Sequence, residues 1–353
     1  MKDKLPLKDL QKMAIDLLTM YQKNGNLKLK VPIRSSSNIK YDKKLHQYVV
    51  GEREKDLDIR NIAQSKPFTQ RVWLMWFIKT QLLEMGHTAS LRDLYYSAMN
   101  VQLNYAEQGE SNKAVEDIEA MLSIEREALG IVAKTRGTIF GELTAKFSEG
   151  EFKGKRIDMS SNPEGQAIGS DLALADFVST KADKIIVVEK NAMFKRFIEF
   201  KVHEKQNALI MGLEGQPPRN ARLLARRITE ELNLPCYVLV DNDVWGESIA
   251  FNFIFGSAST SHLKGFNVPK AQWIGAWRED IVKYGLPSDP LDDTDLRKVD
   301  ILLKDQRYQN GRWKTELESF KKFKRLSELE AFSAKGLPFI VEKYLPDKFN
   351  NLK

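Results

Sequence analysis

Two adjacent tyrosines, Tyr95 and Tyr96, follow Arg92 in a stretch with helical spacing. Residues four apart share one face of a helix, so Arg92 is expected to lie beside Tyr96. A phenol is a weak nucleophile because only about one part in a thousand is ionised at pH 7. A neighbouring guanidinium favours the phenolate and stabilises a crowded anionic phosphorane. The pattern therefore indicates a tyrosine that attacks a phosphodiester, although taken alone it also describes an ordinary helix surface with a salt-bridging arginine.

Helical phase distinguishes the two tyrosines. Tyr95 falls on an apolar stripe with Leu91, Leu94 and Ala98, at positions i, i+3, i+4 and i+7. Tyr96 is rotated by ~100° from that stripe. We therefore expect Tyr95 to belong to the core and Tyr96 to face solvent, where it is available for chemistry.

Three carboxylates follow two apolar runs further along the chain. Glu189 ends the run that starts at Lys184, and Asp241 and Asp243 end the run that starts at Cys236. In an open parallel sheet, ligands bind outside the carboxyl ends of the strands. Neighbouring carboxylates repel one another, and a divalent cation with a preference for oxygen ligands, such as Mg²⁺, neutralises them. The sequence favours a Mg²⁺ site, while helix caps or surface acids remain the alternative.

The composition excludes several classes of protein. The chain has 353 residues, 42% hydrophobic and 29% charged, which suits two or three globular domains. No apolar run reaches the ~18–20 residues that span a bilayer, and the N-terminus lacks the apolar core of a signal peptide, so we expect a cytoplasmic protein. Cys236 is the only cysteine, which excludes an internal disulfide and a cysteine-rich zinc site. The net charge of +7 permits a nucleic-acid partner without requiring one.

The first 67 residues are expected to form an N-terminal extension. Residues 8–23 have the periodicity of an amphipathic helix. The stretch 24–51 is typical of one hairpin, in which residues 27–31 alternate and residues 47–50 return after a serine-rich turn. Residues 51–67 are charged and are expected to be a connector.

Residues 68–150 are expected to be mostly helical. Ser90 is a suitable N-cap for the helix that carries the tyrosines. Other helices are expected at residues 69–85, 112–125 and 125–134, with a hairpin strand over 136–143. Three helices and a β-wing describe a winged-helix (CAP-like) domain, a helix-turn-helix variant that docks on duplex DNA.

From residue 181 the pattern changes to α/β, after a polar, glycine-bearing stretch over 151–180 that is expected to be a linker. Apolar strands that alternate with helices predict a mainly parallel sheet over 181–353 with a helical C-terminal elaboration. Strands are expected at 184–189, 208–212, 236–241, 250–255 and 272–276, and helices at 192–203, 220–231, 295–303, 313–329 and 339–344. The fold class is therefore multidomain, α+β followed by α/β.

Several of these motifs together resemble one known family. Leu91–Tyr96 is similar to the catalytic motif of topoisomerase VI A subunits, which are type IIB DNA topoisomerases of archaeal type, and of their relatives, the meiotic double-strand-break proteins. The resemblance covers roughly residues 68–345, with motifs in the family's order. Residues 187–194 and 241–246 resemble the two acidic motifs of the family's Toprim domain. The other matching segments are 215–219, 129–137, 273–275 and 328–337.

Three positions depart from the family pattern. Asn242 stands where glycine is common, and it is a mild change because asparagine tolerates positive φ. Val244 replaces a usual proline, which puts the shape of the loop in doubt but removes no ligand. Asn191 stands where a small or acidic residue is usual.

The resemblance implies a function. Tyr96, assisted by Arg92, would form a 5′-phosphotyrosyl link, and Glu189, Asp241 and Asp243 would hold Mg²⁺. The family works as a homodimer of A subunits within an A₂B₂ heterotetramer, in which the ATPase B subunit binds ATP. This chain agrees, since it has no Gly-rich phosphate loop of the Walker type. Tyr96 of one protomer would work with the metal site of the other, on double-stranded DNA in the nucleoid.

The resemblance also suggests contact surfaces. We expect the helix at 8–23 to contact the B subunit, with packing on its own domain as the alternative. Arg219 and Arg222, from a cluster of arginines, and Arg136 near the wing are the candidates for contacts with the DNA backbone. Such contacts depend on salt and are largely blind to base sequence.

Three other functions remain open on the sequence alone. A break-forming relative would cut DNA without strand passage. A non-enzymatic DNA-binding module would carry a degenerate Toprim domain, although Tyr96 and all three acids are present. A Toprim nuclease would use water as its nucleophile and leave Tyr96 structural.

Overall fold

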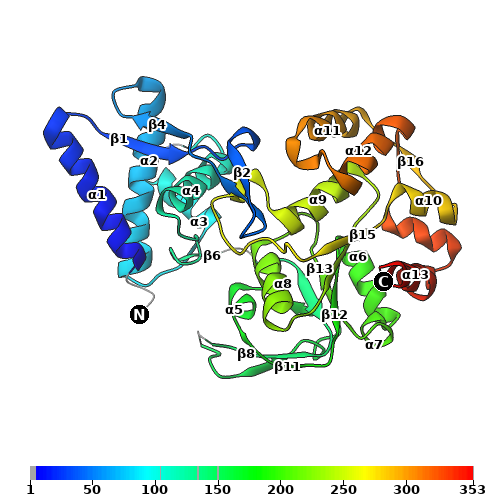
Figure 1. Ribbon diagram of the computed structural model, residues 1–353. Helices are drawn as coiled ribbons and strands as arrows, with labels where there is room; N and C mark the ends of the chain where they lie inside the picture. The colour runs from blue at the N-terminus through cyan, green and yellow to red at the C-terminus, as the bar shows by residue number, and fades with distance from the viewer. Residues whose placement is uncertain (1–4, 104, 133–134, 149–150, 353) are drawn as a thin grey trace. The chain divides into compact units, whose positions relative to one another are not determined.

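The computed structural model describes residues 5–103, 105–132, 135–148 and 151–352. The chain forms two compact units (Figure 1). The N-terminal unit comprises Met1–Lys134 together with Ser257–Lys264, and the C-terminal unit comprises Thr135–Gly256 and Gly265–Lys353. A short segment from the second half of the sequence thus belongs to the first unit.

The N-terminal unit begins with helix α1 (Leu5–Asn24) and four short strands. Strand β1 (Lys28–Pro32) pairs antiparallel with β4 (Glu54–Asp58), and β2 (Ile39–Asp42) pairs with β3 (Gln47–Val50). The expected single hairpin over 24–51 is therefore wrong, and the expected connector contains the true partner of β1.

Cross-strand charge explains this pairing. In the register of β1 and β4, Leu29 lies opposite Leu57, and both are buried. On the outer face, the ammonium of Lys28 lies 3.0 Å from a carboxylate oxygen of Asp56. The charges that make residues 51–67 look like a connector are thus the solvent-facing half of a strand, where opposite charges stabilise neighbouring strands.

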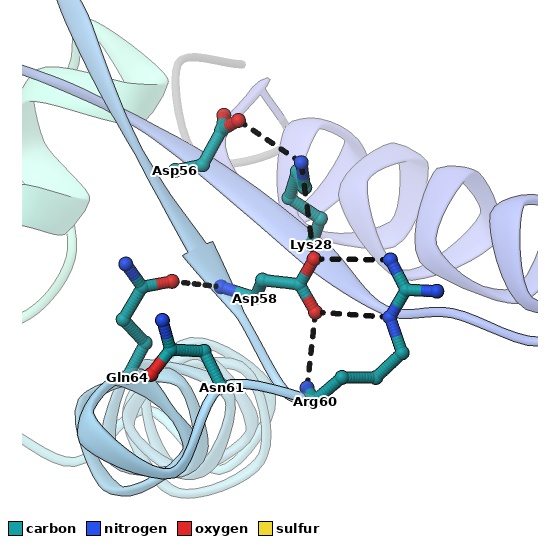
Figure 2. Close-up of a pocket in the computed structure, with 6 residues that line it drawn as sticks. All are labelled: Lys28, Asp56, Asp58, Arg60, Asn61 and Gln64. Atoms are coloured by element: carbon teal, nitrogen blue, oxygen red, sulfur yellow. Dashed lines mark hydrogen bonds and ion pairs between the residues drawn. The ribbon is translucent and has the colours of Figure 1, made fainter.

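The corner between β4 and helix α2 (Ile62–Phe77) is closed by side chains around a shallow hollow (Figure 2). The Asp58 backbone N–H donates to Gln64 Oε1 at 2.9 Å, and Asn61 caps the start of α2. Hydrogen bonds from the side chain and the backbone of Arg60 lower the pKa of Asp58 to about 2. The polar groups of this hollow satisfy one another, which identifies it as a structural corner.

The helices after β4 follow the expected order, except that the last expected one is missing from the part of the chain that the structure describes. Helix α2 continues into a π-helical segment, Ile78–Glu84, and α3 (Leu91–Met99) and α4 (Gln108–Leu122) come next. The expected helix at 125–134 is absent among the described residues there, and residues 133 and 134 lie outside them. Residues 126–130 form a turn instead, and Gly130 has a φ of +80°, which only glycine adopts readily.

After this turn comes strand β6 (Ile131–Val132), which pairs in parallel with β5 (Ala89–Ser90). Strand β5 directly precedes α3 in the sequence. A Cβ atom at Gly130 would lie 3.0 Å from Leu82 Cβ, so the close packing at this turn also requires glycine. The pairing anchors the start of the helix that carries the tyrosines.

One buried carboxylate ties this unit together. Asp117 on α4 is 1% exposed and accepts ion-pair contacts from Arg34 at 2.6 Å and Arg71 at 2.8 Å. Lys55 on β4 approaches the same carboxylate at 3.5 Å. The segment after β1, strand β4 and helix α2 are thereby fixed to α4 through a single anion.

The inserted segment Ser257–Lys264 contains a 3-10 turn, Ala258–Thr260, and packs on the hairpin of β2 and β3. The Gln47 amide donates to the Leu263 carbonyl at 3.0 Å, and the Val50 N–H donates to the Ser261 carbonyl at 3.1 Å. These bonds join both ends of β3 to the inserted segment.

The C-terminal unit is built on a six-stranded sheet whose central strands are parallel, as the alternating pattern predicts. Four of the five expected strands are present with nearly the expected bounds. The sheet order is β10 (Gln166–Ala167), β7 (Thr138–Phe140), β13 (Ala208–Gly212), β12 (Lys184–Val188), β14 (Cys236–Leu239) and β15 (Gln272–Gly275), with β7 and β10 antiparallel at one edge.

Helices cover both faces of this sheet (Figure 1). Alternate residues of β12 point to opposite sides: Ile185 and Val187 pack in one core and Ile186 and Val188 in the other. The first core includes side chains from α8 (Arg219–Glu231) and α9 (Val244–Phe255), and the second includes side chains from α6 (Asn191–Glu199), α7 (Val202–Lys205), α10 (Arg278–Tyr284) and α13 (Leu345–Asn351).

The expected strand at 250–255 is wrong, because these residues form the second half of helix α9. The helix starts at the N-cap Asp243 and is buried on nearly all sides, so its sequence shows no polar face. A short run that is apolar all round does not distinguish a buried helix from a buried strand.

The expected wing and linker also differ from the structure. Strand β7, within the expected wing over 136–143, pairs with β13 of the large sheet. Strand β8 (Leu143–Lys146) pairs with β9 (Arg156–Asp158) and β11 (Asp176–Thr180) in a second sheet, and α5 (Ser170–Ala173) lies in the expected linker. The chain leaves the large sheet at Gly141, whose φ of +133° ends the strand.

The C-terminal elaboration consists of helices α11 (Asp293–Lys304) and α12 (Gly311–Phe323), followed by short turns. Lys324 adopts a φ of +51°, which ends the helix expected over 313–329, and β17 (Arg325–Leu326) then pairs with β16 (Asp289–Pro290). The remaining turns are Ser36–Asn38, Gln306–Tyr308, Leu329–Lys335 and the π-helical Ile340–Tyr344. Across the described residues, every helix is too short or too polar to cross a membrane.

The Asp117 contacts predict a large loss of stability on neutralisation. Asp117→Asn leaves the buried Arg71 guanidinium without its counter-ion and takes from Arg34 the nearer of its two carboxylates. We expect it to lower the free energy of unfolding by about 3–5 kcal/mol in urea titrations. Asp56→Asn removes a carboxylate that is 47% exposed, and it should cost less than about 1 kcal/mol. Equal losses in the two variants would contradict the role of Asp117.

Candidate active site

Helix α3 presents the tyrosines from a fixed start. The Ser90 hydroxyl accepts the Asp93 N–H at 3.2 Å, and the Asp93 carboxylate accepts the Ser90 N–H at 2.8 Å. This reciprocal capping box satisfies two backbone donors that a helix end otherwise leaves unpaired. The same bonds lower the pKa of Asp93, so the cap is ionised at neutral pH.

The two tyrosines of α3 lie on different sides of the helix. Tyr95 packs against the core of the N-terminal unit, and its ring centroid is 6.5 Å from that of Tyr105. Tyr96 is 51% exposed. A guanidinium nitrogen of Arg92 donates to the Tyr96 hydroxyl at 3.4 Å, and this contact raises the pKa of Arg92. The exposed phenol oxygen thus has a permanent cation beside it.

Two neighbouring strands bring the carboxylates to one edge of the sheet. Strands β12 and β14 are parallel neighbours in which Val188 is paired with Leu239, so Glu189 and Asp241 follow at the same end. The Glu189 side chain is buried, and one of its oxygens, Oε2, has no hydrogen-bond partner. Burial first, and then the charges of Asp241 and Asp243, raise the pKa of Glu189 to about 8.

Asp241 is held on both of its oxygens. Oδ1 accepts the Leu329 N–H at 2.8 Å, and Oδ2 lies 2.8 Å from the ammonium of Lys190. Burial raises the pKa of Asp241 to about 6, although both of these contacts act in the opposite direction.

Asp243 acts as the N-cap of α9. Its Oδ1 accepts the Gly246 N–H at 2.5 Å, and burial raises its pKa. A Cβ atom at Gly246 would lie 2.6 Å from the Asp241 carbonyl oxygen, so the approach of α9 to the acids requires glycine there.

These residues suit a divalent cation by their chemistry. The charges of Asp241 and Asp243 raise the pKa of Glu189 at the carboxyl edge of the sheet, and a buried Glu189 oxygen has no partner. Over the described ranges, however, no three acidic, histidine or cysteine side chains are grouped closely enough to hold a metal ion. The acids have the negative charge and the oxygen donors that Mg²⁺ prefers, although both oxygens of Asp241 are bonded to protein donors in this arrangement.

The structure adds residues that the sequence reasoning missed. Lys190 contacts Asp241, and the segment with Glu328 and Glu330 lies against the same ammonium. Lys190 directly follows Glu189, and that adjacency is a signal that could have found it. Glu328 is 139 residues further along the chain than Glu189, and local sequence carries no sign of its approach.

The candidate arginines gather around the start of α8. Arg136 precedes β7 and donates to the Glu214 carbonyl at 2.7 Å, while the Arg219 guanidinium lies over the Phe266 ring at 4.7 Å. Arg222 is 5% exposed, and burial together with Arg219 lowers its pKa to about 10. Arg222 therefore points inward, and Arg136 is on the large sheet rather than on a wing.

Asn242 is explained by its contacts. Its side-chain amide donates to Glu316 at 3.3 Å, and its backbone exchanges two hydrogen bonds with Ser327. Asn242 is not among the described residues with positive φ, so conformational tolerance does not account for it. Val244 is the buried first residue of α9, and Asn191 is the first residue of α6.

Tyr96 belongs to the N-terminal unit, and the three acids belong to the C-terminal unit. The tyrosine and the acids therefore lie on different compact units of the chain. Within its own unit, the tyrosine is positioned by a capped helix and the acids by the ends of adjacent strands.

Comparisons with known proteins match both halves. The family model for the Toprim domain of the topoisomerase 6 A subunit and Spo11 matches residues 184–349, and the model described as "Type IIB DNA topoisomerase" matches residues 66–131. The A subunit of type 2 DNA topoisomerase 6 from Methanothermobacter thermautotrophicus is 37% identical over 91% of this chain and 90% of its own length. The proteins of the same name from Natronomonas pharaonis and Archaeoglobus fulgidus are 29% and 30% identical over 99% and 92% of this chain, and over 97% and 91% of their own lengths.

The pKa of Glu189 predicts how pH affects stability without metal. A carboxyl group whose pKa rises from 4.5 to about 8 on folding stabilises the folded state fully below pH 4.5, and this contribution is lost as pH rises through 8. Glu189→Gln is neutral at every pH. In EDTA, we expect this variant to be more stable than the original chain at pH 9, by a few kcal/mol, and similar to it at pH 5.

The measurement is thermal unfolding across this pH range. Glu199→Gln, an exposed position on the neighbouring helix α6, is the control and should follow the original chain at every pH. A Glu189→Gln variant that is less stable at pH 9 would show that the buried carboxyl is not the source of the pH dependence.

Proposed function

Because this chain belongs to the family of topoisomerase 6 A subunits, which are type IIB DNA topoisomerases, we propose that it cleaves and religates both strands of DNA through Tyr96. The observation that supports this most directly is the exposed Tyr96 hydroxyl beside Arg92, on a capped helix within the matched residues 66–131.

The proposed cleavage is a transesterification. The Tyr96 oxygen forms a bond to phosphorus as the bond from phosphorus to the 3′ oxygen breaks. The phenolic proton is lost, the 3′ oxygen leaves as a hydroxyl, and the 5′ phosphate stays on the tyrosine. Arg92 stabilises the added negative charge on phosphorus. One phosphoester replaces another, so religation reverses the step with little change in bond energy.

We assign Glu189, Asp241 and Asp243 as the residues that hold Mg²⁺. When bound there, Mg²⁺ positions the phosphate and stabilises the charge on the leaving oxygen. Glu189 must lose its proton on metal binding, because burial keeps its pKa at about 8. Metal binding should therefore release protons and become tighter as pH rises toward 8.

We infer that the tyrosine of one protomer meets the acids of a second. Tyr96 and the acids lie on separate units of one chain, and a homodimer would bring two such pairs together. Two cleavages in opposite strands would then open a gate for a second duplex, which relaxes or decatenates DNA.

We propose that helices α2 to α4, from residue 68 onward, form the winged-helix DNA-binding domain, with residues 1–67, which include the start of α2, as an extension of it. The three helices and the short β5–β6 pair lie within the N-terminal unit. Arg136 and Arg219 are the proposed contacts to the DNA backbone from the C-terminal unit. Arg222 would support this region from within, since its guanidinium is buried.

We propose that α1 contacts an ATPase B subunit in an A₂B₂ assembly, where the B subunit binds ATP. One stripe of α1 exposes Ile15, Leu18 and Tyr21, which are 61%, 62% and 56% accessible. Next to this stripe, Leu10, Met13 and Leu17 of the same helix pack on its own unit. Large apolar side chains gathered on one exposed stripe are typical of a protein interface.

The nucleophile is tested by trapping the covalent complex. The chain is incubated with a B subunit, ATP, Mg²⁺ and supercoiled DNA, and the mixture is denatured with detergent. Tyr96→Phe should abolish protein-linked DNA ends because it removes the attacking oxygen. Tyr95→Phe should retain them, since its ring packs in the core. Linked ends from Tyr96→Phe would overturn the proposal, and linkage without relaxation would indicate a break-forming enzyme.

The B-subunit contact is tested with Ile15→Glu combined with Leu18→Glu. Two charges in the exposed stripe should weaken co-purification with a B subunit by tenfold or more, because charges are costly to bury in an interface. Val282→Glu, at an equally exposed apolar residue of the C-terminal unit, is the matched control. Normal assembly of the double variant would place the contact elsewhere.

A further inference from the structure

We propose that Lys190 is the resident cation of the acid cluster, which neutralises Asp241 until Mg²⁺ binds and then moves to Glu328 and Glu330. This inference rests on the metal site of the proposed function. It adds an exchange of cations in which the ammonium of Lys190 has two binding positions. We call the contact with Asp241 the first station and the contact with Glu328 and Glu330 the second station.

The first station is Asp241. The ammonium of Lys190 lies 2.8 Å from Asp241 Oδ2, and the other oxygen of the same carboxylate is bonded to the Leu329 N–H. Both oxygens are therefore engaged by protein donors. A Mg²⁺ ion that binds Asp241 directly would stand beside the ammonium, and two cations at contact distance repel strongly in a partly buried site.

The second station is already within reach. Glu328 and Glu330 lie 3.1 and 3.5 Å from the same ammonium. Their side chains are 54% and 35% exposed, whereas Asp241 is 2% exposed. Only a small rotation of the flexible lysine is needed to exchange the buried carboxylate for the two outer ones.

The second station is held in place by the fold. Ser327 exchanges two backbone hydrogen bonds with Asn242, at 2.8 and 2.9 Å, and Leu329 is fully buried. Glu328 and Glu330 flank this anchored leucine. Their backbone is thus fixed to the same loop that carries Asp241 and Asp243, so the two stations keep their spacing.

The negative charges of the three carboxylates explain why a cation from the protein itself is needed. Glu189 and Asp241 are buried, Asp243 is half-buried and close to Asp241 in sequence, and the Lys190 ammonium contacts Asp241 directly. Lys190 is the N-cap of α6 and directly follows Glu189, so its backbone is as fixed as the ligands themselves. A tethered ammonium reduces the repulsion within the metal-free cluster, and it can leave without diffusing away.

The test measures metal affinity, using the full chain titrated with Mg²⁺ and with Mn²⁺ by calorimetry. Lys190→Met should bind both ions at least tenfold more tightly, because the competing cation is gone. Lys190→Arg keeps the charge and should stay within a few-fold of the original affinity. Lys195→Met is the matched control: it removes a lysine from the same helix, paired with Glu164 at 2.8 Å, and should change the affinity less than twofold.

A second pair of variants tests the transfer. Glu328→Gln with Glu330→Gln removes the second station, so Lys190 stays on Asp241 and metal binding should weaken several-fold. The same two substitutions added to Lys190→Met should have little effect. Circular dichroism and unfolding transitions check that each variant is folded.

The outcomes separate this inference from the proposed function. If Lys190→Met binds metal no more tightly than Lys195→Met, Lys190 is not a competing cation. If the glutamine substitutions weaken binding equally with and without Lys190, Glu328 and Glu330 act on the metal directly and the transfer is overturned. If Asp243→Asn leaves metal binding unchanged, the proposed metal site itself fails, whatever the Lys190 variants show.

Discussion

The burial of carboxylates at the end of a parallel sheet is the constraint on which the C-terminal unit depends. Strands β12 and β14 are neighbours, so their ends bring Glu189 and Asp241 together whether or not a cation is present. Desolvation and mutual repulsion raise the pKa of both groups. The surrounding structure offsets this cost with the Lys190 ammonium, the Leu329 N–H and the helix start at Asp243. The cost of burying these acids is thus partly offset by groups of the protein itself.

The N-terminal unit packs one tyrosine against its core and exposes the next. The capping box of Ser90 and Asp93 sets the first turn of α3. The parallel pair β5–β6 joins the start of this helix to the strand that follows the turn at residues 126–130. Helical rotation then exposes Tyr96 with Arg92 and directs Tyr95 to the core. The buried Asp117 fixes the supporting helices at some distance from the tyrosine, so rigidity and reactivity come from separate residues.

Sequence patterns predicted the elements whose signal is local. The capped start of α3 follows from a serine before an apolar period, and the central strands follow from apolar runs bounded by turns. The errors arose where partners are distant. Strand β4 looks like a connector because its charges pair across to β1, and β7 looks like a wing although it joins the large sheet. The second half of α9 looks like a strand because burial on all sides removes the polar period that identifies a helix.

The sequence by itself singled out the candidate reactive groups: Tyr96 with Arg92 by helical phase, and Glu189, Asp241 and Asp243 by their place after apolar runs. Only the tertiary structure decided what surrounds them. It placed Lys190 between Asp241 and two glutamates more than 130 residues away in sequence, turned Arg222 inward, and assigned residues 135–180 to the second unit. The reason is physical: helix phase and strand ends are set by neighbours in sequence, whereas burial and ion pairing depend on which segments the fold brings together.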